Sequence, residues 1–560
     1  MRGNHSKRRW AALPVVLALA LAVALAVALA ACGSSSGGGG AATTGGTPVK
    51  GGTLIAIKQA DPQSLDPAID FEGPGWAMEH LVYNCLVGYA PASGAAGLKI
   101  VPELATEVPT PTNGGKTYIF HIKQGVKFAP PVNREVTAED FVYSFNRMMN
   151  LPLAPAKGYY DFIKGAAAVE ASKATTVSGI KALDKYTLEI DLTKPNAGLL
   201  LNVMAMPFAA AVPKEWVAKW GNGGNGISMH ALGTGPYYCA NWTPGTEIDF
   251  KRNPNYTGPP AYPDEIKVEL SVTASTAVLK LESGQADTLM DYIPPADYVQ
   301  VSTNPTWSKQ VVQAPAIWLD YLFINRNVKP FDNLQVRQAL EYAVNRDKIV
   351  KLLSGVADPL AQIYPAGLPG HVDGATFGYS YDPAKAKAML AAAGYPNGFT
   401  TTLMSHNVDP WPKVLQSIQN DLAQVGITAN IKTLNEDAYW TLIGHQTAVG
   451  IGLNDWSMDY PDPSDYVISL FSKSSAITEG TNPSFWWSPT VEAELLQAQG
   501  MSDQSQRIAL FSKMQEQIMA DAPAVPLYQN KWLTMFSQRT EGGYMHPVWI
   551  FDFAHYWIKQ

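Results

Sequence analysis

The sequence predicts a mixed α/β fold that is divided into several domains. Segments with strand-like alternation and segments with helical spacing follow one another along the 560 residues without a regular period. A chain of this length exceeds what one hydrophobic core usually serves, so we expect at least two domains. Hydrophobic residues make up 46% of the chain, which is ample for such cores, and we find no internal repeat.

The first half of the chain alternates short strands with helices. We predict a strand at 51–57, a turn at 63–67 and a helix at 76–87. A strand at 117–122 and a second strand-like pair at 126–128 follow. A further helix is predicted to begin after Thr137, with Asp140 at its third position, as in a capping box with Asp in place of Glu.

The second half contains three helical patterns followed by a strand-like run, at 336–353, 384–393, 411–425 and 427–433. Gly394 and Gly426 stand where the second and third of these helices are expected to end, because glycine adopts the left-handed conformation that closes many helices.

The first 40 residues have the organisation of a bacterial lipoprotein leader. Four basic residues lie within the first nine positions, and an apolar run at 13–31 is about long enough to enter a bilayer. Two alanines precede Cys32, and the Gly and Ser residues at 33–40 carry no side chains able to pack. A transmembrane anchor has a similar apolar run, but these small residues around a cysteine favour cleavage.

We therefore predict a signal peptide at 1–31, a lipid on Cys32 and a Gly/Ser linker at 32–50. The processed chain is then expected on the extracytoplasmic face of the cell membrane, held there by its lipid anchor. An uncleaved transmembrane anchor is the alternative.

Composition argues against a nucleic-acid partner. Removal of residues 1–31 takes away four basic residues and no acidic one, so 37 Lys and Arg face 48 Asp and Glu, a formal charge of −11. The 15 Trp and 25 Tyr exceed what cores need, and such side chains also build ligand clefts. Cys85 and Cys239 are expected to form either one disulfide or two buried thiols.

Patterns that indicate catalysis are weak. Residues 33–37 match a nucleophile elbow but lie in the linker, with neither strand before nor helix after them. The nine histidines lack zinc-site spacing, so we predict no metal and no cofactor. Asp459 and Asp462 are a carboxylate pair of the kind that hydrolases use, which leaves a secreted hydrolase as an alternative to a protein that is not an enzyme.

Short motifs occur in a fixed order along the chain. They lie at Gly51–Leu54, Ser64–Pro67, Val101–Ala105, Gly114–Tyr118, Lys123–Phe128, Thr137–Phe145, Gly233–Tyr237, Arg252–Tyr256, Val336–Leu340, Asn345–Lys348 and Trp456–Pro463. Each motif is weak alone, but in this order the chain resembles the extracytoplasmic solute-binding proteins of family 5, which bind oligopeptides, dipeptides or nickel for ABC importers. The resemblance extends over most of residues 51–540.

The resemblance implies a two-lobed periplasmic-binding-protein fold of type II, the Venus flytrap, with an extra domain on the first lobe. Carried onto this chain, domain I takes 51–95, 230–315 and 526–560, domain II takes 96–229, and domain III takes 316–525. The ligand is expected between the first and third domains.

The resemblance also implies a set of ligand-binding residues. In peptide-binding relatives the Asp of a Trp-x-x-Asp motif meets the α-ammonium of the ligand, and that position is Asp459 here. Trp456 and Tyr460 flank it. With Tyr439 and Trp440 just upstream, they are candidates for side-chain pockets or for core packing.

A second part of the expected site is a turn that matches the loop giving backbone contacts in relatives. It consists of Phe71, Glu72, Gly73, Pro74 and Gly75 and is followed by Trp76. An extended peptide offers its N–H and C=O groups to such a segment, and glycines let another backbone come close.

One departure from the family weakens the expectation of a short free peptide. Relatives place an arginine near the ligand carboxylate, but residues 441–455 and the earlier loop 404–410 contain no Lys or Arg. The positions expected for arginine hold Gly444, Leu453 and Val408. The carboxylate of a longer peptide would then stay in water; otherwise the ligand is another solute, such as an oligosaccharide or a metal chelate.

The resemblance thus implies a monomeric binding protein that captures a solute, a peptide in the first instance, and delivers it to the permease subunits of an ABC importer.

Overall fold

The computed structural model describes residues 47–152, 154–223, 226–501 and 503–559. The predicted signal peptide, Cys32 and most of the linker therefore lie outside the described residues. No helix in the described ranges combines the length and the apolar character that crossing a membrane requires.

The described chain alternates helices and strands, as expected. The helices are α2 (Gly73–Val82), α3 (Ala138–Asn150), α4 (Ala166–Glu170), α5 (Ala197–Met204), α6 (Lys214–Trp220), α7 (Ala274–Glu282), α8 (Pro295–Thr303), α9 (Leu334–Ala343), α10 (Arg346–Leu352), α11 (Pro383–Ala392), α12 (Trp411–Gln424), α13 (Glu436–Ile443), α14 (Pro463–Phe471), α15 (Pro489–Gly500) and α16 (Gln504–Asp521). The strands are β1 (Thr53–Ile57), β2 (Val87–Tyr89), β3 (Ile100–Pro102), β4 (Thr117–His121), β5 (Ile180–Asp184), β6 (Thr187–Asp191), β7 (Tyr237–Thr243), β8 (Glu247–Arg252), β9 (Glu265–Glu269), β10 (Thr288–Leu289), β11 (Val311–Pro315), β12 (Trp318–Ile324), β13 (Ala357–Pro359), β14 (Thr400–His406), β15 (Thr428–Leu434), β16 (Ile451–Ser457), β17 (Ala524–Met535), β18 (Thr540–Glu541), β19 (Met545–His546), β20 (Ile550–Phe551) and β21 (Trp557–Ile558).

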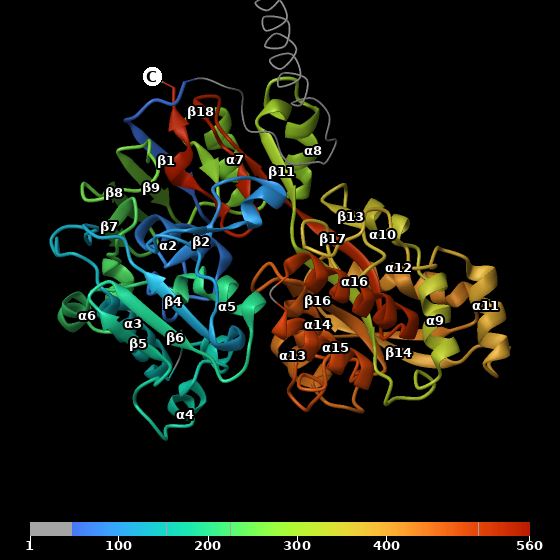
Figure 1. Ribbon diagram of the computed structural model, residues 1–560. Coiled ribbons are helices and arrows are strands. Elements are labelled where there is room, and N and C mark those ends of the chain that lie inside the picture. Colours follow the sequence, from blue (N-terminus) through green and yellow to red (C-terminus); the bar gives the residue numbers. More distant parts are fainter. Residues whose placement is uncertain (1–46, 153, 224–225, 502, 560) are drawn as a thin grey trace, which may run out of the picture. The chain divides into compact units, whose positions relative to one another are not determined.

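The first sheet has the strand order β10-β1-β9-β8-β7 (Figure 1). β1 is parallel to both of its neighbours, whereas β8 and β7 continue the sheet in antiparallel pairing. Alternate residues of these strands, such as Ile248 and Phe250 of β8, are fully buried, which is the pattern of a sheet with one face on a core.

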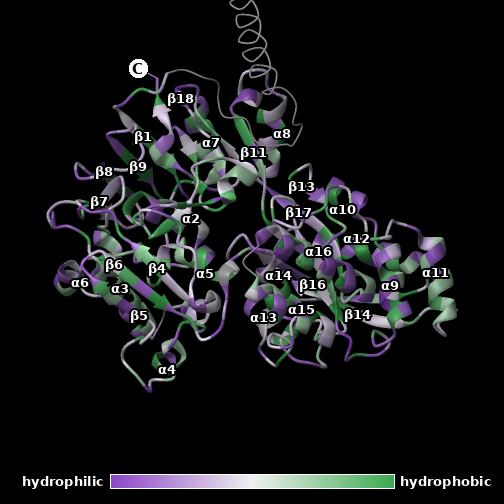
Figure 2. Ribbon diagram, in the orientation of Figure 1, coloured by the Kyte–Doolittle hydropathy of each residue, from purple (hydrophilic) through white to green (hydrophobic). Residues whose placement is uncertain are grey.

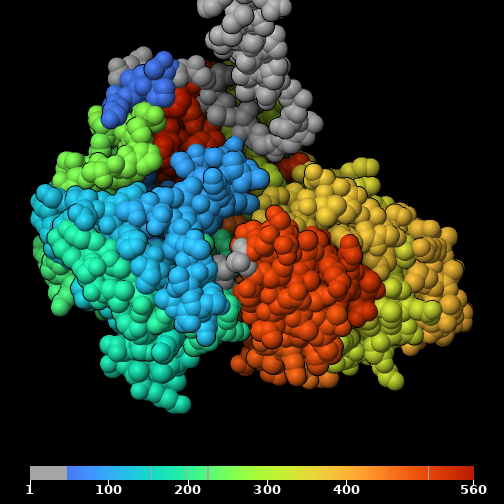
Figure 3. Space-filling view, viewed as in Figure 1, coloured from blue at the N-terminus to red at the C-terminus, as the bar shows by residue number. Residues whose placement is uncertain are grey.

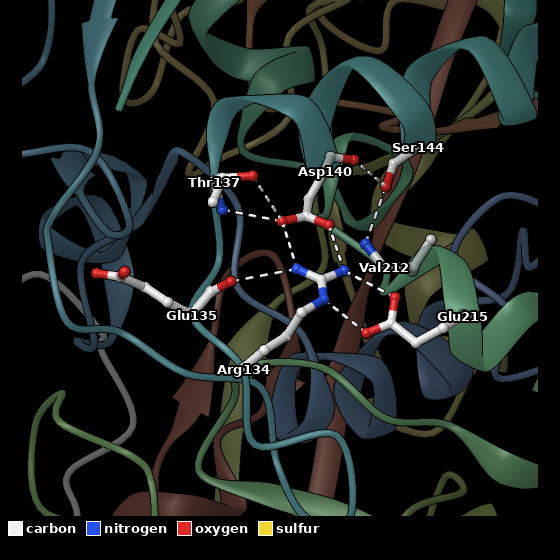
Figure 4. Close-up of polar contacts among 7 residues, drawn as sticks. All are labelled: Arg134, Glu135, Thr137, Asp140, Ser144, Val212 and Glu215. Atoms are coloured by element: carbon white, nitrogen blue, oxygen red, sulfur yellow. Dashed lines mark hydrogen bonds and ion pairs between the residues drawn. The ribbon is translucent and has the colours of Figure 1, made fainter. Parts of the chain in front are cut away.

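The second sheet is antiparallel, in the order β4-β6-β5, and α3 packs on it. The predicted capping box at the start of α3 is confirmed. The Asp140 carboxylate accepts a hydrogen bond from the Thr137 backbone N–H at 2.9 Å and bonds of 2.9 and 2.7 Å from the two terminal nitrogens of Arg134 (Figure 4). The same guanidinium also binds Glu215, which ties the start of α3 to α6.

The third sheet runs β11-β17-β12-β16-β14-β15, with β13 paired to β17 beside this path. β12 and β16 are antiparallel along their full length, and β14 is parallel to both β15 and β16. Helices α9 to α16 surround this sheet and form one continuous surface with it (Figures 1 and 3). In Figure 2 these helices carry both purple and green residues, and their buried apolar residues form one core with the strands of the sheet.

Two large hydrophobic cores underlie these sheets. One core joins the first and second sheets with the last residues of the chain, and the other lies between the third sheet and its helices. β17 pairs with β12 through residues 524–528 and with β11 through residues 531–535, so the expected boundary at 525/526 falls inside this strand. The domain boundaries stay predictions.

Three elements differ from the sequence-based expectation. The helix expected at 76–87 begins and ends earlier, as α2, and Val87 belongs to β2. The strand expected at 126–128 is reduced to an isolated bridge. The helix expected at 336–353 is two helices, because the Asn345 side chain accepts a 3.0 Å hydrogen bond from the Lys348 N–H and so starts α10 afresh.

Cys85 and Cys239 are free thiols, so the disulfide alternative is corrected. The Cys85 Sγ atom donates to the carbonyl oxygen of Met206 at 3.1 Å, and the Cys239 Sγ atom lies 3.7 Å from the carbonyl oxygen of Met229. Burial raises the pKa of both thiols, that of Cys239 to about 12, which keeps them protonated and unreactive at neutral pH.

Candidate ligand-binding site

Strand β16 leads into the predicted Trp-x-x-Asp motif. Its seven residues pair with β12, and the chain then turns through Asp459 and Tyr460 before α14 begins. The side chain of Asp462 caps α14 by accepting a 2.9 Å hydrogen bond from the Ser464 N–H. The motif is thus held between the end of a buried strand and the start of a helix.

Asp465, in the first turn of α14, fixes the geometry of this turn. One oxygen of its buried carboxylate accepts hydrogen bonds of 3.0 Å from the Trp456 indole N–H and from the Asp459 backbone N–H. These two hydrogen bonds fix the orientation of the Trp456 ring and the position of the Asp459 backbone. The sequence analysis did not single out Asp465. Its position three residues after Asp462, the N-cap of α14, is a signal that could have identified it.

The Asp459 carboxyl group faces an aromatic residue from the other core. The Tyr159 hydroxyl hydrogen-bonds it, which lowers its pKa, but burial has the larger effect and raises this pKa to about 6. The Tyr159 ring meets the Tyr460 ring edge to face, with centroids 6.2 Å apart. No ion pair to Asp459 exists among the residues that the structure describes.

The loop before α2 joins the same aromatic group. Phe71, which is 41% exposed, stacks on Tyr159 with centroids 6.4 Å apart and on Phe208 at 6.0 Å. Trp76 packs edge to face against Phe71 at 5.8 Å. The structure therefore brings Phe71 and Trp76 together with the Asp459 turn through Tyr159, a residue that sequence reasoning missed because nothing in its local sequence marks it.

Glu72 and the glycines have local roles in this loop. Glu72 pairs with Lys58 at 3.0 Å and accepts a 3.0 Å hydrogen bond from the Gln63 N–H, and Gly73 is the first residue of α2. A Cβ atom at Gly75 would lie 2.2 Å from the Asp70 carboxylate. Gly75 is thus needed to make room for a side chain of the same loop.

Tyr439 and Trp440 lie elsewhere. Tyr439 is fully buried, and its hydroxyl donates to the carbonyl oxygens of Leu453 at 2.5 Å and Met404 at 3.2 Å, so it packs in the core beside β16. Trp440 contacts the rings of His406 and Trp411 with centroids 5.7 Å away in both cases. Of the two readings open for Tyr439, the structure places it in core packing.

A second pair of acids lies on the same two strands, and sequence reasoning missed it. Asp320 of β12 is directly opposite Asp455 of β16 in the sheet register. Asp320 accepts hydrogen bonds from the Trp411 indole at 3.2 Å and from the Asn530 amide at 2.9 Å, and Asp455 accepts one from the Trp318 indole at 2.9 Å. Burial raises the pKa of both carboxyl groups, that of Asp455 to about 6.

No group of three or more His, Cys, Asp or Glu side chains in the described part of the chain is arranged to hold a metal ion.

Comparison with known proteins decides the family. Residues 99–477 match the model of the bacterial extracellular solute-binding proteins, family 5. The chain belongs to this family. The predicted fold class, an α/β periplasmic-binding-protein fold, is confirmed with it.

Relatives match this family 5 protein over nearly its whole length. It is 28% identical over 527 residues to the dipeptide-binding protein of Escherichia coli, covering 90% of this chain and 95% of the relative. A Helicobacter pylori periplasmic binding protein in complex with the peptide STSA has a TM-score of 0.71 and 28% identity, covering 91% of this chain and 99% of that one. Oligopeptide binding protein 2 of clavulanic acid biosynthesis has a TM-score of 0.84 at 23% identity, covering 93% of this chain and 99% of that one.

Proposed function

We propose that this family 5 protein captures a peptide outside the cytoplasmic membrane and delivers it to the permease of an ABC importer. The relatives are named as binding proteins for dipeptides and other peptides, which supports a binding role over a catalytic one. The ligand is held between the two lobes as they close, so it must bind the closed form better than the open one.

One observation carries the proposal. Asp459 is a half-buried carboxyl group that meets a hydroxyl and has no basic partner among the described residues. Aromatic side chains from both cores, Tyr159 and Tyr460 from one and Trp456 from the other, lie beside it. A charge-assisted hydrogen bond from a peptide α-ammonium would stabilise the ionised form of this carboxylate. Phe71, Trp456 and Tyr460 would line the surroundings of the first peptide residues.

The finer features of the proposal come from the sequence. A lipid on Cys32 would hold the protein, as a monomer, on the extracytoplasmic face of the membrane. The Gly/Ser residues after it would leave the folded part free to reach the permease.

We predict that Asp459→Asn weakens binding of a free-amine peptide about thirtyfold, the equivalent of about 2 kcal/mol for the loss of a charge-assisted hydrogen bond. The amide fills the same space but carries no charge to meet the ammonium. Titration calorimetry with tetra-alanine and with its N-acetylated form measures the effect.

Asp264→Asn is the matched control, because that carboxylate is exposed and pairs with Arg252 at 3.1 Å on the surface. It should leave the affinity unchanged. Equal affinity of the wild type for the free and acetylated peptides, or an Asp459→Asn variant that binds as the wild type does, would remove Asp459 from the proposed site. Copurification of a sugar or a metal chelate would support the non-peptide alternative.

A further inference from the structure

Most buried carboxylates in the described part of the chain have a basic partner. These pairs join Asp66 to Arg147, Asp140 to Arg134, Asp287 to Arg539, Glu341 to Arg346, Asp421 to Lys348, Asp462 to Arg507, Glu494 to Lys513, Glu541 to Lys559 and Asp552 to His555. Four buried carboxylates have no such ion pair among the described residues: Asp70, Glu79, Asp320 and Asp465. A buried acid without a counter-charge is costly, so the exceptions need a reason.

Two of these exceptions, Asp465 and Asp70, lie in the turn and the loop of the candidate site. Asp465 lies directly behind Asp459. Asp70 precedes α2, and Glu79 lies within that helix, which also carries Trp76. Asp320 lies opposite Asp455 on β12 and β16. Burial raises the pKa of each of these four carboxyl groups, so a positive charge brought near one of them would favour its ionised form. Residues 441–455 contain no Lys or Arg that could supply such a charge.

Hydrogen bonds hold the Asp320–Asp455 pair in place without a basic partner among the described residues. All the side chains that donate to it are neutral: the indoles of Trp318 and Trp411, the amide of Asn530 and the hydroxyl of Tyr528. Such donors orient a carboxylate but supply no positive charge. Asp320 is buried, whereas Asp455 and Trp318 are half-buried, so an incoming group would have to reach the pair from the side of Asp455.

Aromatic rings border this pair. His406 stacks on one face of Trp411 with centroids 3.9 Å apart. Tyr292, from the segment after β10, is 44% exposed and stacks on Trp532 at 4.9 Å, and the charge of Asp320 contributes to raising the pKa of Tyr292. Carboxylates beside aromatic faces form a setting that favours an ammonium or a guanidinium group.

We propose that Asp455, backed by Asp320, is the subsite for a basic side chain of the bound peptide, so that the protein prefers peptides carrying Lys or Arg near the N-terminus. This inference rests on the proposed function. Asp455 lies in β16 and Asp459 in the turn after it, four residues along the chain, so their Cα atoms are at most about 13 Å apart. In an extended peptide, a lysine at the second or third position reaches that far from the α-ammonium.

The test compares tetrapeptides of alanine that carry lysine or methionine at the second or third position, by titration calorimetry at low salt. The structure predicts that one lysine peptide binds at least tenfold more tightly than its methionine counterpart. Asp455→Asn should remove this preference, while Asp264→Asn should keep it. The thermal midpoint of each variant reports whether it is folded.

The outcomes separate this proposal from the function on which it rests. Lysine and methionine peptides that bind equally well would overturn the basic subsite and keep the peptide-binding function. A preference that survives in Asp455→Asn would overturn the assignment to Asp455. Failure of all the peptides to bind would overturn both proposals. The comparison of peptides on the wild type needs no variant, so it decides even if Asp455→Asn does not fold.

Discussion

At the scale of single residues, Asp459 connects ligand binding to proton binding. Its pKa is raised to about 6 by burial, and the Tyr159 hydroxyl reverses that effect only in part. A ligand ammonium favours the ionised carboxylate, so binding and protonation oppose each other. In the ligand-free protein the same shift acts on folding. The fold accommodates the protonated form of Asp459 better than the ionised form. Its contribution to the free energy of unfolding is therefore fully present below the unfolded pKa of about 4 and is lost as the pH rises through about 6.

We therefore expect the affinity for tetra-alanine to fall as the pH is lowered below about 6, by up to about tenfold per pH unit. Above that pH the carboxylate is already ionised, whereas below it the ligand must displace a proton. Calorimetric titrations from pH 7.5 down to pH 4.5 measure the profile. The Asp459→Asn variant, which has no proton to displace, supplies the comparison, and a wild-type profile as flat as that of the variant would contradict the role of this residue.

At the scale of elements, the conformation at the start of α2 depends on Gly75 more than on Gly73. The Asp70 carboxylate fills the space beside Gly75, where a Cβ atom would come within 2.2 Å of it, whereas a Cβ atom at Gly73 would meet the Ile550 side chain at an ordinary 3.5 Å. Asp70 is fully buried and has little room to retreat. The loop that carries Phe71 therefore keeps its shape only with glycine at the second of these positions.

The pair of variants Gly75→Ala and Gly73→Ala tests this dependence. Gly75→Ala should destabilise the protein by about 1–3 kcal/mol through overpacking and should also weaken peptide binding, because the Phe71 loop must shift. Gly73→Ala should cost much less. Thermal unfolding and calorimetry on both proteins measure the two effects, and equal stability of the two variants would refute the argument.

Local signals explain which elements were predictable. The capping box joins Thr137 to Asp140, three residues further on, and Gly394 and Gly426 close their helices with φ of +93° and +90°. Each of these helix boundaries is therefore determined by residues that are close together in the sequence. The break at Asn345 was missed because the apolar pattern continues across it, although asparagine is a good cap.

At the scale of the whole molecule, the site depends on contacts that no local pattern contains. The motif around Asp459 was found by resemblance, but its neighbour Tyr159 comes from a turn 300 residues earlier in the chain. Asp320 faces Asp455 because of the register of β12 and β16. Patterns of sequence predict which residues favour a strand, but the pairing of two strands follows from the packing of the complete core.

The whole chain also has to be held at the membrane, and Cys32 is the residue predicted to do this. Acyl chains on that cysteine would bind the bilayer with about 0.8 kcal/mol for each buried CH₂ group. We expect Cys32→Ala to abolish lipidation and to prevent the normal processing of the leader. Intact mass spectrometry of the protein extracted from membranes measures both, and Cys239→Ala, which changes a free thiol of the folded part, should be processed and lipidated as the wild type is. An unmodified Cys32 with residues 1–31 still attached in the wild-type protein would establish the uncleaved anchor instead.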